Sequence, residues 1–348
     1  MAGDSPAGTP GTEFSSTATP AAAEEGAPPG LGPYRLAARR LQRNRLALAF
    51  GGLFLLVVIL CLLAPVYAHQ IAHTGPNDNH VTGTVRVGGK VKEVVSAQGI
   101  PIGPTWGSHF LLGADNDGRD VAVRLLYGGR NSLQIGLLAA LITLVLATII
   151  GLAAGYYRGW VDGVLSRMLD VIWSYPAVLL GLALGTALAI GGLDLGLFQL
   201  QGNSLMVPTA IIGIVYIPYV AKPLRGQVLG LREREFVDAA RAQGMSSRRI
   251  LVSEILPNVA STLIVFVPLI VANAILLEAA LSFLGAGVRA PNPSWGTMIA
   301  DGIRQIPAAI HQTLVPGVML VLTVLGINVF GDGVRDALDP RATIRIEH

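Results

Sequence analysis

The sequence predicts an all-α membrane protein with six transmembrane helices and an enlarged extracellular loop. Of its 348 residues 52% are hydrophobic and only 14% are charged, whereas soluble domains carry about 25% charged residues. Mean hydropathy is +0.57. Six apolar windows each reach the roughly 20 residues that a helix needs to cross a bilayer. They cover residues 46–68, 131–157, 171–193, 195–221, 255–277 and 305–331.

The N-terminal part divides into a tail and a first span. Residues 1–33 are rich in Ala, Gly, Pro, Ser and Thr and have no apolar period, so we expect a disordered cytoplasmic tail. Residues 34–68 form an Arg-rich amphipathic lead-in and then the first span. A cleaved signal peptide is the alternative, because Val66-Tyr67-Ala68 could serve as a cleavage site. The apolar window is too long and starts too far from Met1, which favours a retained span.

Residues 69–118 are hydrophilic and predict an extracellular loop. Segments 81–87 and 90–95 flank Gly88-Gly89, which is typical of a small β-hairpin. His69, His73 and His80 are metal-ligand residue types. No Cys or acidic cluster accompanies them, so solvated histidines are favoured and no metal site is expected. The single cysteine, Cys61, excludes an intrachain disulfide.

Positive charge fixes the predicted orientation. If the six windows cross in turn, 17 of the 25 Lys and Arg residues fall on one side of the membrane. Because cytoplasmic loops carry an excess of Lys and Arg, both termini are expected in the cytoplasm. The long polar loop between the fourth and fifth windows is expected there too.

That polar loop has a helical pattern. Phe236, Ala239, Ala240 and Gln243 recur at helical spacing, which predicts a helix over 235–243 with a flat patch at the paired alanines. Gly244 is placed to end this helix. Ser246 would start a second helix, and Pro257 would break it before the chain turns apolar. A solvated loop with incidental helicity is the alternative.

The same loop resembles the EAA signature of bacterial ABC-importer permeases. The resemblance lies in Asp238-Ala239-Ala240, then Gly244, then Leu256-Pro257, with Asp where the motif has Glu. It implies that loop 223–257 forms cytoplasmic coupling helices that dock on an ATPase. The docking residues that it implies are Glu235, Phe236, Asp238, Ala239, Ala240, Gly244, Leu256 and Pro257.

The stretch 112–136, just outside the second window, alternates in charge. Its charged residues are Asp115, Asp117, Arg119, Asp120, Arg124 and Arg130. An ion-pair network that fixes the start of the span is favoured, and a substrate contact through Arg119 and Asp120 is the alternative. This stretch resembles the L-G-T-D-x-x-G-R-D-V pattern of dipeptide and oligopeptide permeases, with Ala114 in place of Thr.

Segments 277–287, 293–299 and 315–341 are similar to the same family, so the resemblance covers about 111–341. It favours the C-type transmembrane subunit, with a permease core over 119–334 and a cytoplasmic C-terminal tail over 335–348.

Glu278 is the one carboxylate at the end of a span, and an ionisable group in that position is a functional candidate. We consider it a possible pathway or gate residue. Alternatively, Ser282, Gly285 and Gly287 indicate an external re-entrant helix, where Glu278 would cap or pair. Gly151, Ala154 and Gly155 predict close helix packing.

The resemblance implies a subunit of an ATP-driven importer, most simply for di- or oligopeptides, in a bacterial cytoplasmic membrane. Its expected partners are a second homologous permease, two cytoplasmic ATPases, an extracellular substrate-binding protein and the lipid bilayer; no nucleic acid is expected. The sequence has no P-loop, so we expect no enzymatic activity and no cofactor on this chain, with ATP and Mg used by the partners. An ion-gradient secondary transporter, which needs paired intramembrane carboxylates, and an importer of nickel or another small solute stay open.

Overall fold

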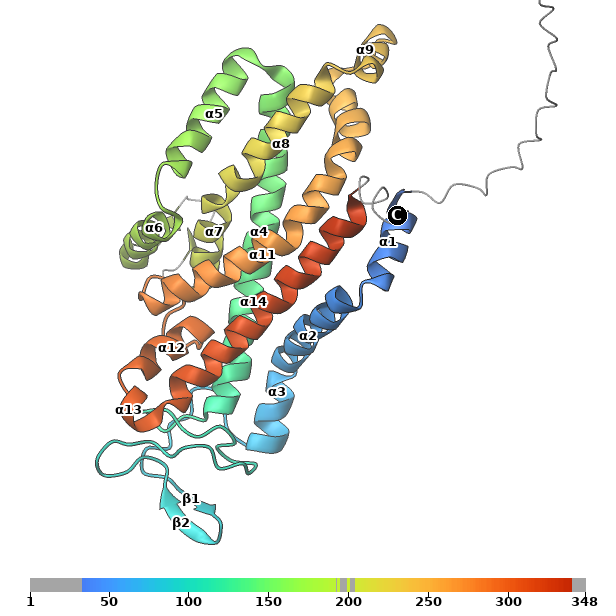
Figure 1. The fold of residues 1–348 in the computed structure, drawn as a ribbon. Helices are drawn as coiled ribbons and strands as arrows, with labels where there is room; N and C mark the ends of the chain where they lie inside the picture. The colour runs from blue at the N-terminus through green and yellow to red at the C-terminus, as the bar shows by residue number, and fades with distance from the viewer. Residues whose placement is uncertain (1–32, 192, 195–198, 201–203, 340–348) are drawn as a thin grey trace, which may run out of the picture.

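The structure is a computed structural model that describes residues 33–191, 193–194, 199–200 and 204–339. The tail predicted over 1–33 lies outside these residues except for Pro33, and so does 340–348. Within the described residues the fold is a bundle of long helices with a small two-stranded sheet at one end (Figure 1). The prediction of an all-α membrane protein is therefore confirmed.

Five helical runs in the described residues are long and apolar enough to cross a membrane. A pair of helices, α5 (Gly159–Trp173) and α6 (Ala177–Gly191), completes a sixth span if it is counted as one. The five runs are α2 (Arg45–Leu62), α4 (Val121–Tyr157), α7 with α8 (Met206–Val215, Ile217–Arg232), the run Ser247–Phe283 that ends in α11 (Leu256–Phe283), and α14 (His311–Leu338).

Shorter elements join these runs. Helix α1 (Pro33–Arg43) precedes α2, while α3 (Ala64–Tyr67) and a π-turn (Ala68–Ala72) follow it. Helices α12 (Trp295–Ile303) and α13 (Ile306–Ala309) lie between α11 and α14. The polar loop holds α9 (Glu235–Ala242), α10 (Ser247–Arg249) and a second π-turn (Ile250–Ile255).

The third predicted span is wrong as a single straight helix. The chain bends by 89° between α5 and α6, with Pro176 just before α6 begins. Proline lacks a backbone N–H and its ring clashes with the preceding turn, so a helix that reaches it bends or ends. The window 171–193 therefore holds the end of α5, a break and α6.

The fourth predicted span begins too early. Residues 195–198 and 201–203 lie outside the described part. The short strands β3 (Leu193–Asp194) and β4 (Gln199–Leu200) pair antiparallel, and helix begins only at Met206. At its other end the helix runs past the window to Arg232, which carries it out of the apolar region and into the polar loop.

Helix α4 lies at the centre of the bundle and packs against α8, α11 and α2. Glycines let the backbones approach, as predicted for Gly151 and Gly155. A Cβ on Gly155 would lie 2.6 Å from Val228 Cβ, and one on Gly151 would lie 3.1 Å from the Ala221 carbonyl oxygen. Both are closer than ordinary van der Waals contact, so α4 and α8 meet with almost no side chain between them.

The loop over 69–118 contains the predicted β-hairpin in shorter form. Strand β1 (Thr84–Val87) pairs antiparallel with β2 (Lys90–Glu93), in a register that sets Val87 opposite Lys90. Gly88 and Gly89 both have positive φ, +58° and +80°, as a two-residue type I′ turn requires. Among the described residues, no three His, Cys, Asp or Glu side chains are grouped to hold a metal.

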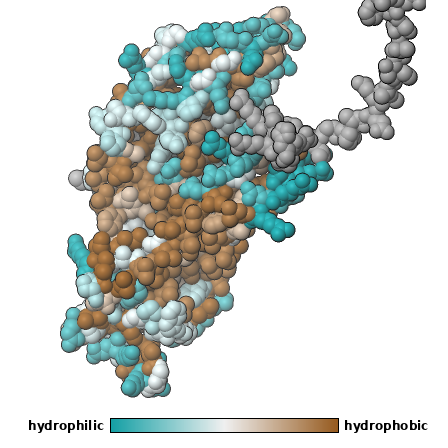
Figure 2. All heavy atoms as spheres, in the orientation of Figure 1, coloured by the Kyte–Doolittle hydropathy of each residue, from teal (hydrophilic) through white to brown (hydrophobic). Residues whose placement is uncertain are grey.

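The surface fits a membrane-embedded bundle. Figure 2 shows a broad hydrophobic band over the middle of the molecule, with hydrophilic atoms above and below it. Exposed apolar side chains such as Leu55, Leu141, Ile149 and Val321 belong to the spanning helices. Exposure of this extent is expected where lipid replaces water as the solvent.

Candidate functional site

The first part of the site is α9 in the polar loop, which lies at the end of the bundle opposite the β-hairpin (Figure 1). It starts after Arg234, whose backbone is extended, and carries Glu235 and Asp238 in its first turn, where negative charge complements the helix dipole. At its end the Met245 N–H donates to the Ala240 carbonyl and the Gly244 N–H to that of Arg241. This bond pattern is a Schellman motif.

Gly244 has a φ of +79°, a backbone conformation that glycine adopts without strain. The predicted helix end at Gly244 is thereby confirmed. The motif fixes the direction in which the chain leaves α9, so the short helix and the segment after it form one rigid corner.

One face of α9 is buried and the other is exposed. Val237 (0% exposed) and Ala240 (5%) pack with Val228, Ile250 and Ile255. Phe236, Asp238, Ala239 and Gln243 are exposed. The predicted flat patch of two alanines is therefore wrong, since Ala240 faces the chain's own core. Of the two paired alanines, Ala239 is the one that faces outward, beside Phe236 at 38% exposure.

The predicted break at Pro257 is also wrong. Helix begins after Ser246, as predicted, and continues without interruption to Phe283. Before the proline the hydrogen bonds widen to the π pattern, with the Leu256 N–H donating to the Leu251 carbonyl. This shift accommodates the missing N–H of Pro257, since π-turns insert into α-helices without ending them. Leu256 is half-buried and Pro257 exposed.

Polar contacts tie the loop to the spanning helices. Arg232 Nη1 donates to the Tyr156 carbonyl at 2.6 Å. Arg225 of α8 binds Asp162 of α5 through two nitrogens, at 2.5 and 2.6 Å. Lys222 Nζ lies 2.8 Å from Asp170 Oδ1. Sequence reasoning missed these pairs, because only the fold brings residues some 60 positions apart together. Helices α5 and α8 are thus clamped to each other next to the polar loop.

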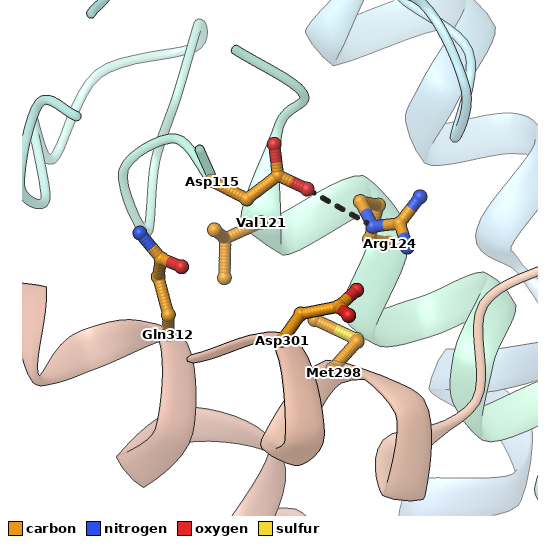
Figure 3. Close-up of a pocket in the computed structure, with 6 residues that line it drawn as sticks. All are labelled: Asp115, Val121, Arg124, Met298, Asp301 and Gln312. Atoms are coloured by element: carbon orange, nitrogen blue, oxygen red, sulfur yellow. Dashed lines mark ion pairs between the residues drawn. The ribbon is translucent and has the colours of Figure 1, made fainter. Parts of the chain in front are cut away.

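The second part of the candidate site is the charged cluster at the start of α4, on the hairpin side of the bundle. Arg119 lies 2.7 Å from both Asp115 and Asp117, and Arg124 lies 3.4 Å from Asp115. Figure 3 shows Asp115 and Arg124 beside Asp301 of α12. Asp301 is 4.0 Å from Arg119, and burial raises its pKa.

The predicted ion-pair network is confirmed for Asp115, Asp117, Arg119 and Arg124, and Asp301 joins it. Arg130 is exposed and makes no ion pair within the described residues, so it does not belong to the network. An open cavity of about 320 Å³ adjoins the cluster, lined in part by Asp117, Arg119, Asp301 and Arg304. Because the carboxylates of Asp115 and Asp117 already pair with Arg119, the network joins loop 69–118 to α4 and α12.

Asp120 is an N-cap and not a surface group. It is 1% exposed and accepts hydrogen bonds from the backbone N–H groups of Ala122, Val123 and Phe110, at 2.8 to 3.1 Å. Burial raises the pKa of its carboxyl, and the three N–H donors oppose that rise. This cap explains why α4 begins ten residues before the predicted window.

Replacing Asp120 by Ala should destabilise the protein by about 2 kcal/mol or more. The cap alone contributes about 1 kcal/mol, and the buried Phe110 N–H would lose its partner at a further cost of about 1–3 kcal/mol. Thermal unfolding in detergent measures the change. Asp117→Ala is the control, because its side chain is 57% exposed and surface ion pairs contribute about 0–1 kcal/mol. Equal melting temperatures for the two variants would contradict the assignment.

Glu278 is enclosed within the chain. It is 0% exposed, and one carboxyl oxygen accepts a hydrogen bond from Ser282 at 2.6 Å. Ser282 in turn accepts from the Val288 N–H at 2.9 Å. The start of α12 covers this region, because Gly296 lies directly against Ala279 and Ser282. The Glu278 carboxyl is thus hydrogen-bonded within α11, and Ser282 joins α11 to the turn that follows it.

Comparison with known proteins agrees with this arrangement. Residues 147–344 match the family described as binding-protein-dependent transport system inner membrane component. Residues 32–81 match the N-terminal TM domain of oligopeptide transport permease C.

Three relatives are similar over most of the chain. The dipeptide transport system permease protein DppC of Alkalihalophilus pseudofirmus is 37% identical over 89% of this chain and 90% of its own length. A putative peptide transport system permease protein of Brucella suis is 38% identical over 90% of this chain and 94% of its own. The glutathione transport system permease protein GsiD of Pectobacterium atrosepticum is 35% identical over 66% and 72%.

Proposed function

This chain belongs to the family of binding-protein-dependent transport system inner membrane components, as a permease subunit of an ABC importer, and from that premise we propose that it carries di- or oligopeptides and is driven through α9. Support for the cargo comes from the dipeptide and peptide permeases that resemble it over about nine-tenths of its length. The glutathione permease among its relatives also carries the name of a peptide.

The single observation that carries the coupling role is the geometry of α9. A capped, eight-residue helix projects from the bundle, buries Val237 and Ala240 against α8 and the π-turn, and leaves Ala239 and Phe236 exposed. A protruding helix with a small outward residue and a flanking aromatic side chain fits a groove on another protein. Since α8 continues into the membrane, a force on α9 acts directly on a spanning helix.

The docking surface that we propose keeps Glu235, Phe236, Asp238 and Ala239 as direct contacts. The four other residues implied by the resemblance have different roles. Ala240 anchors α9 to the core, Gly244 sets the corner, and Leu256 and Pro257 follow the π-turn that leads into α11.

The proposed assembly places four partner subunits of three kinds around this chain. A second, homologous permease would complete the pathway, two cytoplasmic ATPases would bind and hydrolyse ATP with Mg, and an external binding protein would deliver the peptide. Both termini and α9 would face the cytoplasm, as the excess of Arg on that side favours. The division into a core over 119–334 and an external loop over 69–118 is part of this proposal.

The transport experiment uses proteoliposomes that contain the co-purified complex, with ATP inside and the binding protein outside. We expect uptake of a labelled dipeptide that requires ATP. Uptake of glutathione or Ni²⁺ in place of dipeptide, each tested with the same vesicles, would reassign the cargo. Dipeptide uptake that follows an ion gradient and ignores ATP would contradict the ABC mechanism, because an importer of this class draws its energy from the ATPase.

A further inference from the structure

Helix α1 is a basic amphipathic helix at the entrance to the first span. Its sequence, Pro33–Arg43, reads P-Y-R-L-A-A-R-R-L-Q-R and holds four arginines and no acidic residue. Arg45, the first residue of α2, adds a fifth. The helix lies beside the end of α14 (Figure 1). Such a charge pattern next to a transmembrane helix points to an anionic partner.

One face of α1 is fixed to the protein. Ala37 is 8% exposed, and Leu41 lies 3.5 Å from where a Cβ on Gly333 would stand. Arg40 Nη1 donates to the backbone carbonyl of Asp339 at 3.0 Å. These contacts at i, i+3 and i+4 hold the helix against the last turns of α14, so its orientation about its own axis is set.

The remaining face carries Arg35, Arg39 and Arg43, which are all exposed and spaced four residues apart. At this spacing the three side chains form one row along the helix. Leu36, 41% exposed, lies next to that row. A row of guanidinium groups beside an exposed leucine matches the pattern of helices that lie in the membrane interface with Arg at the headgroups.

The chain geometry places this face at the edge of the bilayer. Only Asn44 separates α1 from α2, and its side chain caps α2 by accepting the Ala47 N–H at 3.0 Å. Figure 2 shows hydrophilic atoms over α1, immediately beyond the hydrophobic band that α2 helps to form. A helix that is one residue from a span and lies just beyond the hydrophobic band is at headgroup depth.

We propose that the Arg35–Arg39–Arg43 face of α1 binds the headgroups of anionic phospholipids in the membrane that α2 crosses. The fixed face holds α1 against α14, and the basic face attracts phosphate groups that guanidinium binds well. Lipid bound there would brace α14 and α2 at the same membrane surface. The inference rests on the position of α1 and not on the transported cargo, so it stands even if the proposed cargo is wrong.

The test places an environment-sensitive fluorophore on α1. Gln42 is exposed and lies beside the arginine row, so Gln42→Cys in a Cys61→Ala background carries the dye. The full chain, with its co-purifying subunits, is reconstituted into vesicles of phosphatidylcholine alone or mixed with phosphatidylglycerol. We expect a blue shift of the emission in the mixed vesicles, which added salt reduces because it screens the charges.

A charge-matched pair of variants assigns the shift to α1. Arg35→Gln/Arg39→Gln/Arg43→Gln should abolish the dependence on phosphatidylglycerol. Arg86→Gln/Lys90→Gln/Lys92→Gln removes the same charge from the external hairpin, and this variant should keep the dependence of the emission on phosphatidylglycerol. An undiminished shift in the first variant would overturn the proposal, and so would identical wild-type emission in the two kinds of vesicle.

Two further outcomes are decisive. If the first variant does not fold, the salt dependence of the wild-type protein still decides, because a shift caused by apolar insertion alone is insensitive to salt. Dependence on phosphatidylglycerol that emerges only after deletion of residues 1–32 would assign the basic face to that segment and overturn the proposal as well.

Discussion

Ala239→Asp is expected to abolish ATP-driven uptake while the permease still folds and inserts. The side chain faces outward from α9, so the substitution leaves the packing of Val237 and Ala240 intact. In the docked complex the carboxylate would be desolvated without a partner, at a cost of roughly 2–5 kcal/mol. Docking of the ATPase should therefore weaken by at least about 30-fold. Uptake into proteoliposomes and co-purification of the ATPase measure the two effects.

The matched control for this variant is Ala97→Asp. Ala97 is also an exposed alanine, but it lies in loop 69–118, at the opposite end of the molecule from α9. The Ala97→Asp variant should transport like the wild-type protein. Normal uptake by Ala239→Asp would contradict the coupling role of α9, whereas equal loss in both variants would indicate a general effect of the added charge.

Gly155→Val is expected to have the largest effect on stability. Even a Cβ at this position would lie 2.6 Å from Val228 Cβ and 2.9 Å from the Arg225 carbonyl oxygen, and valine adds two further methyl groups. Overpacking typically costs about 1–3 kcal/mol, and here the obstacles are the β-branched side chain of Val228 and a backbone oxygen, which yield little. We expect a loss of about 3 kcal/mol, visible as a lower melting temperature in detergent.

The substitution should also impair transport, since α8 carries α9 and would be pushed away from α4. Gly163→Val is the control, because a Cβ on Gly163 meets no atom within 4 Å and the residue lies on the exposed side of α5. A Gly155→Val protein that melts and transports like Gly163→Val would contradict the close α4–α8 contact.

Apolar length and charge were sufficient to predict five spanning helices in their order, and a sixth span only if the bent pair α5 and α6 is counted as one. They did not predict where the helices end. The second window was counted from Asn131 because Arg124 and Arg130 interrupt the apolar run. The helix nevertheless begins at Val121, since Asp120 caps it and Asp115 pairs with Arg124. A charge near a helix end does not stop the helix when a partner neutralises it.

Pro176 and Pro257 show a second limit of sequence reasoning, because one interrupts the helix and the other does not. Pro176 lies inside a window that carries no charge, and there the chain bends by 89°. Pro257 was expected to break a helix, yet a π-turn shifts the hydrogen-bond register and the helix continues. Which outcome occurs depends on the hydrogen bonds available around the missing N–H, and these are set by the packing of the fold.

The site was predictable where the signal was local. The helical spacing and Gly244 placed α9 to within one residue of its observed end. The role of Glu278 was not predictable from local sequence. Its burial depends on α12, which comes later in the chain and packs against α11 beside it. The same holds for Asp162 and Arg225, whose ion pair joins α5 to α8.

Photo-cross-linking from α9 tests the coupling claim most directly. Phe236, exposed on α9, is replaced by a benzophenone amino acid, and native membranes are irradiated before the adducts are identified by mass spectrometry. We predict an adduct with a P-loop ATPase, and none with that protein when the same probe stands at position 97 in loop 69–118. If position 236 yields only lipid adducts, or a partner without a P-loop, α9 is not the docking helix of an ATP-driven importer.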